Sequence, residues 1–119
     1  MKIAQARQLS VAFANDGAAN VVGLLIKGGV AMGKTNEEQV SGAMQQLEAM
    51  AEYQLDDACC LMIALWPLAS DLMLHDVCDS IDLWICNNRS RQLIEYLRGR
   101  ALSESDPGVR RHLEELLRV

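Results

Sequence analysis

The sequence predicts an all-α protein, a compact single domain of about six or seven short antiparallel helices over residues 1–119. Three observations favour this class. Apolar residues recur at three- and four-residue intervals in successive segments, which is the helical period. Residues typical of helix starts precede several of these segments. After residue 35 no alternating β-branched runs with hairpin turns occur, and the connections are short, as in a helical bundle or in stacked helical hairpins.

The first 34 residues hold two segments that fit more than one class. Lys2–Ala14 has apolar residues at near-helical spacing, but Leu9–Phe13 alternates and so also fits a strand. Ala18–Lys27 is apolar almost all round, which is typical of either a buried helix or a buried strand. We expect Gly28 and Gly29 to end this second segment.

A helix is predicted from Thr35 to about Tyr53. Thr35 is an N-cap candidate, and Glu38 stands three residues later, which is the spacing of a capping box. An apolar stripe follows with the period of one helix face. It consists of Val40, Met44, Leu47 and Ala51.

The most apolar stretch of the chain is predicted to be the central core helix. Asp56 and Asp57 indicate its start, because carboxylates stabilise helix N-termini. The helix continues through Trp66, and Pro67 should stop or kink it because proline lacks the backbone N–H that a helix needs.

Three further helices are predicted in the last third of the chain. Asp71–Asn88 has apolar residues on one face and aspartates on the other. Ser90 is a cap candidate for a helix that turns Leu93, Ile94, Leu97 and Ala101 inward. Asp106 and Pro107 are typical of a final helix start, with aspartate as N-cap and proline in the first helical position.

Composition excludes several classes of function. Half of the residues are apolar and 23% are charged, which is the balance of a folded domain. A net charge of −5 with few aromatic residues argues against nucleic-acid binding. No apolar run reaches the roughly 18–20 residues that a membrane span needs. The first residues contain no apolar leader, so we expect a cytoplasmic protein.

The four cysteines are predicted to be buried free thiols in a reducing compartment. Cys59, Cys60, Cys78 and Cys86 all lie in apolar helical segments, and no C-x-x-C spacing occurs. His75 and Cys78 could form half of a zinc site, but no second pair has ligand spacing. A helical metal or redox protein is therefore only a third hypothesis, and we expect no metal and no cofactor.

The charges are unevenly distributed along the chain. Residues 54–88 contain six aspartates and no lysine or arginine, whereas residues 89–119 contain seven arginines and five acidic residues. Asp76, Asp79 and Asp82 recur at three-residue intervals on one helix face. This pattern fits either a solvated face or an acidic surface for a partner with a basic or amphipathic helical surface, with Trp84 as an anchor if it is exposed.

One segment matches the phosphate-loop motif. Residues 28–35 satisfy G-x-x-x-x-G-K-[ST], in which backbone amides would cradle phosphates, Lys34 would reach the outer phosphates and Thr35 would bind magnesium. The motif residues are Gly28, Gly33, Lys34 and Thr35. The residues that follow are predicted to be helical and supply no parallel sheet, so a nucleotide-binding protein is the alternative function.

From about Thr35 to its end, the chain resembles the small tetratricopeptide-like chaperones that guard needle subunits in type III secretion. The similarity lies in Asn36-Glu37-Glu38, in Asp57-Ala58 with Leu61-Met62, and in Ser105-Asp106-Pro107, each at a helix start. The resemblance implies an all-helical scaffold whose concave apolar face holds a helix of a secreted partner.

These observations favour a non-enzymatic protein-binding module. No set of catalytic residues has a diagnostic spacing. Such a module would sequester or neutralise one protein partner, as a secretion chaperone or a toxin-neutralising immunity protein does. The sequence is also compatible with a homo-oligomer.

Overall fold

The computed structural model describes residues 1–31, 35–69, 71–87, 91–105 and 107–118. Within these residues it contains seven α-helices, one short 3-10 helix and no strand, which confirms the all-α prediction. The elements are α1 (Ile3–Asp16), α2 (Ala18–Ala31), α3 (Asn36–Ala51), α4 (Leu55–Leu65), η1 (Trp66–Leu68), α5 (Asp71–Asn87), α6 (Arg91–Ser103) and α7 (Pro107–Arg118).

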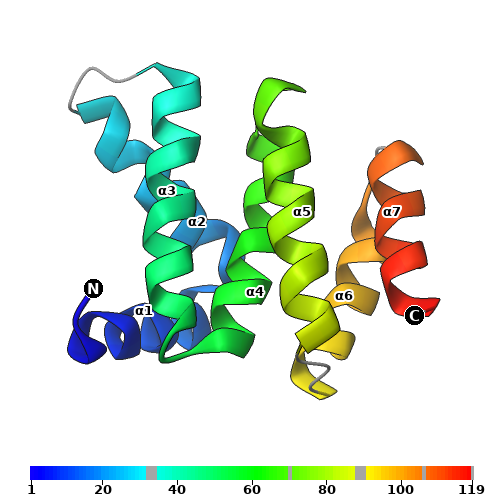
Figure 1. Ribbon diagram of the computed structural model, residues 1–119, viewed down its shortest axis with the longest axis horizontal. Helices are drawn as coiled ribbons and strands as arrows, with labels where there is room; N and C mark the ends of the chain where they lie inside the picture. Colours follow the sequence, from blue (N-terminus) through cyan, green and yellow to red (C-terminus); the bar gives the residue numbers. More distant parts are fainter. Residues whose placement is uncertain (32–34, 70, 88–90, 106, 119) are drawn as a thin grey trace.

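The helices from α2 onward form two layers (Figure 1). Helices α3, α5 and α7 lie side by side in front and run in the same direction, while α2, α4 and α6 lie behind them and run the opposite way. Helix α2 packs against α3, α3 against α4, α4 against α5, and α6 against α7. Because consecutive helices are antiparallel and their connections are short, the architecture is a row of stacked helical hairpins. Helix α1 crosses one end of this row.

Helix α4 is the centre of the core, as predicted. Every residue from Ala58 to Leu65 is buried, and Trp66 is buried directly after them. The helix contacts α1, α2, α3, α5 and α6. It ends before Pro67, where the chain continues as η1, because a proline in the helix interior would remove a backbone hydrogen bond.

The predicted capping box at the start of α3 is confirmed. The Thr35 hydroxyl accepts a hydrogen bond from the Glu38 backbone N–H at 3.3 Å, and the Glu38 carboxylate accepts one from the Thr35 N–H at 3.1 Å. Val40, Ala43, Met44, Leu47 and Met50 are the buried residues of this helix. It ends at Ala51, two residues before the predicted end.

Both N-terminal segments are helices, so the strand alternatives are wrong. Gly17 links α1 and α2 with a φ of 86°, a conformation that residues with a Cβ rarely adopt. The expectation that Gly28 and Gly29 end the second segment is also wrong, because α2 continues to Ala31. Tertiary packing explains this: Val21 and Val22 are buried, and such packing stabilises a helix more than its intrinsic propensity does.

The last three helices were predicted close to their observed bounds. Val77, Ile81, Leu97, Ala101 and Leu113 are buried, and Pro107 is the first residue of α7. The predicted caps Ser90 and Asp106 lie outside the described residues. No helix in the described part of the chain is long and apolar enough to cross a membrane.

Candidate functional site

The acidic face of α5 is narrower than the sequence predicted. Asp76 and Asp79 are exposed, and Leu83 lies beside them with 61% of its surface exposed. Trp84 is instead partly buried and packs against the core, so it is not an exposed anchor. We call Asp76, Asp79 and Leu83 the acidic strip. It places two carboxylates beside an exposed leucine on one helix face.

Asp82 turns from this strip toward α7. Its Oδ1 lies 3.5 Å from Nε2 of His112, and 47% of its side chain is exposed. The His112 ring in turn lies against buried Trp66, with 4.5 Å between the ring centroids. Side chains from η1, α5 and α7 therefore meet at this point, which gives Asp82 a structural contact within the chain.

The phosphate-loop match does not have the expected surroundings in the described residues. The segment before it is helix α2 rather than a strand, and α2 includes Gly28. The Thr35 hydroxyl donates a hydrogen bond to the Glu38 carboxylate at 2.9 Å and so serves the start of α3. Gly33 and Lys34 lie outside the described residues.

The cysteines of α4 are buried free thiols, as predicted. Burial, with a smaller effect of the Asp56 carboxylate, raises the pKa of Cys59 to about 12, and burial also raises the pKa of Cys60. Cys78 is less buried, and burial with the nearby Asp82 raises its pKa to about 11. These thiols stay protonated at neutral pH, which makes them weak nucleophiles and ligands. The Cys86 side chain is not among those described.

The acidic and sulfur-bearing side chains that the structure describes do not converge on a metal position. Among the described residues, no group of three or more His, Cys, Asp and Glu side chains is placed to hold a metal ion. His75 is exposed on α5, one turn before the half-buried Cys78. The described geometry therefore brings no further ligand to this predicted half-site.

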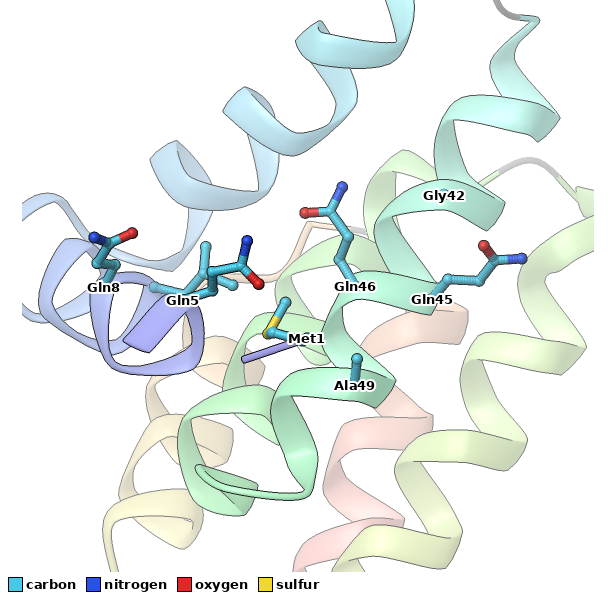
Figure 2. Close-up of a pocket in the computed structure, with 8 residues that line it drawn as sticks. Met1, Gln5, Gln8, Gly42, Gln45, Gln46 and Ala49 are labelled. Carbon is cyan, nitrogen blue, oxygen red and sulfur yellow. The ribbon is translucent and has the colours of Figure 1, made fainter. Parts of the chain in front are cut away.

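A groove of about 640 Å³ lies between α1 and α3 (Figure 2). Carboxamide side chains come from both helices, and Met1 lies between them. The lining residues are Met1, Gln5, Gln8, Leu9, Gly42, Gln45, Gln46 and Ala49. Each glutamine can donate and accept hydrogen bonds, so the described side chains of the groove offer neutral carboxamides and no acidic or basic group.

A second groove, of about 500 Å³, lies between α6 and α7. It is lined by Arg98, Ala101, Leu102, Arg110, Glu114 and Leu117, and we call it the α6–α7 groove. Leu102 is 87% exposed, more than any other large apolar residue among those described. The groove thus combines apolar side chains with two arginines and one glutamate.

The turn beside this groove is held by polar contacts. Arg110 Nε donates a hydrogen bond to the backbone carbonyl of Glu104 at 3.0 Å. The Glu104 carboxylate lies 2.8 Å from the guanidinium of Arg100 and is largely buried. Glu104 lies in the turn, so one contact joins this turn to α6 and the other joins it to α7. Together they fix the turn relative to both walls of the groove.

Sequence reasoning missed the two leucines that these surfaces expose. Leu83 is adjacent to Trp84, the aromatic residue that the sequence offers as an anchor if it is exposed. Leu102 follows buried Ala101 and lies outside the apolar stripe that α6 turns inward. This position outside the stripe is the sequence signal that could have identified Leu102 as exposed. An apolar residue outside the core stripe of a helix is a candidate for contact with a partner.

Comparison with known proteins assigns no relative: the chain matches no family model, no curated protein and no solved structure.

Proposed function

We propose that the protein is a non-enzymatic binding module that sequesters or neutralises one protein partner, as a secretion chaperone or an immunity protein does. The observation that supports this most directly is the α6–α7 groove with its exposed Leu102. A leucine in water contributes nothing to folding, whereas the same leucine buried against a partner stabilises the complex.

The groove has the size and composition of a site for an apolar helix face. Its volume of about 500 Å³ lies within the roughly 300–1,000 Å³ of typical binding pockets. On α6, Arg98 and Leu102 are four residues apart, and on α7 Arg110 and Leu117 are seven apart, so each pair lies on one helix face. A partner helix would place apolar residues between the two helices and polar residues along their rims.

The acidic strip of α5 supplies a second contact with different chemistry. Asp76 and Asp79 project from a rigid helix beside exposed Leu83. A basic or amphipathic surface on the partner would pair with the carboxylates while an apolar side chain covers the leucine. Charges of this kind favour fast association and correct orientation more than they add affinity.

The test is affinity capture from extracts of cells that express the native protein. Wild type should recover one protein in stoichiometric amount. Leu102→Asp should lose most of it, and Leu83→Asp should weaken recovery if the acidic strip also contacts the partner. The matched control is Val11→Asp. It changes an apolar residue that is 59% exposed and lies in α1, a helix that contributes no residue to the α6–α7 groove or to the acidic strip.

Two outcomes would contradict the proposal. One is that no stoichiometric partner appears under conditions that preserve the fold, as judged by circular dichroism. The other is that Leu102→Asp, Leu83→Asp and Val11→Asp all retain the partner equally. The identity of a captured protein separates the two classes, because a chaperone holds a secreted subunit whereas an immunity protein holds a toxin and abolishes its activity.

A further inference from the structure

The outward face of α2 has features that the folding of a single chain does not require. A hollow of about 460 Å³ runs along it. The hollow is lined by Asp16, Ala19, Asn20, Gly23, Leu24 and Lys27, and we call this surface the α2 face. Buried Val21 and Val22 belong to the opposite side of the helix, so the α2 face points away from the core.

Two residues in the middle of the α2 face are costly in an isolated chain. Leu24 exposes 63% of its surface. Gly23 lies in a helix interior, where glycine is less stable than alanine, yet a Cβ added there would meet nothing within 4 Å. Packing among the described residues therefore gives no reason for a glycine, whereas close approach of a second helix would.

The charges at the two ends of the α2 face are opposite. Asp16, the last residue of α1, lies at its N-terminal end, and Lys27 of α2 lies at its C-terminal end, about 14 Å along the helix from the first residue of α2. Neither forms an ion pair with another described residue. A surface with a negative end and a positive end is complementary to itself when a second copy is turned by a two-fold rotation.

We propose that the α2 face is the interface of a symmetric dimer in which two α2 helices pack antiparallel. The rotation places Asp16 against the partner subunit's Lys27 and repeats the contact at the other end. Leu24 of each subunit then packs near the flat surface that Gly23 provides on the α2 helix of the other subunit. This site is separate from the α6–α7 groove and the acidic strip, so it does not depend on the proposed function.

The interface is small, and the dimer should therefore be weak. A contact between two short helix faces buries less than the roughly 1,200–2,000 Å² that stable complexes bury. We expect a dissociation constant of about 10–100 µM, which corresponds to a dimer that forms and separates with concentration. A foreign partner would not need opposite charges at the two ends, which is why the charge pattern favours a second copy.

The experiment is sedimentation equilibrium of the full chain from about 5 to about 500 µM, which brackets the expected dissociation constant. Wild type should pass from monomer to dimer over this range. Asp16→Lys and Lys27→Glu each bring like charges together twice in the dimer and should each raise the dissociation constant about tenfold or more. The double variant exchanges the charges and should return it to within about threefold of wild type.

Leu24→Asp tests the apolar part of the same interface, and Val11→Asp is its control because Val11 is 59% exposed on another helix. The first should abolish the dimer and the second should leave it unchanged. A monomer at every concentration overturns the proposal. So does a dimer that both single charge variants leave unchanged, because another surface would then form it. A folded Leu24→Asp monomer, shown by circular dichroism, excludes unfolding as the reason.

Discussion

Helices α4 and α7 have the same helical period but opposite relations to the core. In α4 every residue from Ala58 to Leu65 is buried, whereas Leu113 is the buried residue among the described side chains of α7. Helix α4 contacts five other α-helices, while α7 packs mainly on α6 at one edge of the molecule (Figure 1). We therefore expect stability to reside around α4, while the edge helices leave side chains available for binding.

The largest effect should come from a cavity in α4. Leu61→Ala removes a fully buried side chain at the centre of the core and should lower the free energy of unfolding by about 3–5 kcal/mol. Urea denaturation followed by circular dichroism measures this. A loss below about 1 kcal/mol would show that α4 is not the centre of stability.

Alkaline pH should also act chiefly through α4. The Cys59 thiol ionises near its ordinary pKa of 9.0 in the unfolded chain but only near about 12 in the folded protein. The contribution of this thiol to the free energy of unfolding is therefore fully present below pH 9. It is lost as the pH rises toward 12, because the thiol of the unfolded chain loses its proton first. The loss should be on the order of 1 kcal/mol per pH unit per buried thiol.

Unfolding by urea at pH 8 and pH 10 measures this dependence, and Cys59→Ala is the matched variant. Its stability should fall less between the two pH values than that of wild type. Tyr96 adds to the same trend at higher pH, because burial raises its pKa to about 12. An equal pH dependence of Cys59→Ala and wild type would contradict the assignment to Cys59.

A cavity in α7 should cost less than the same kind of cavity in α4. Leu113 is fully buried, but the edge helix around it can move inward to fill part of the space. Leu113→Ala should lower the free energy of unfolding by about 2 kcal/mol, the lower end of the range for such changes. If Leu113→Ala lowered the free energy of unfolding as much as Leu61→Ala does, the proposed difference in stability between α4 and α7 would be wrong.

The smallest effect should come from the contact between α5 and α7. A double-mutant cycle with His112→Ala and Asp82→Asn should give a coupling energy of about 0.2–1 kcal/mol, because both side chains are partly exposed. A coupling energy of zero would show that the pair does not hold α7.

Most of the fold could be predicted because its signals are local. The capping box at Thr35, the helix end before Pro67 and the start at Pro107 each depend on the chemistry of a few adjacent residues. The candidate surfaces were harder to predict, since exposure depends on which helix lies opposite. Trp84 could serve as an anchor only if it were exposed, but it packs on the core, and Leu83 beside it is exposed.

The helical class, the order of most helices and the uneven distribution of charge follow from the chain alone, because periodicity, caps and composition are properties of neighbouring residues. The choice between helix and strand for residues 18–31 depends instead on packing on α3 and α4, which buries one side of that segment. Packing between helices also selects which leucines remain exposed. Burial is set by contacts between residues far apart in the chain, and a single sequence does not contain those contacts explicitly.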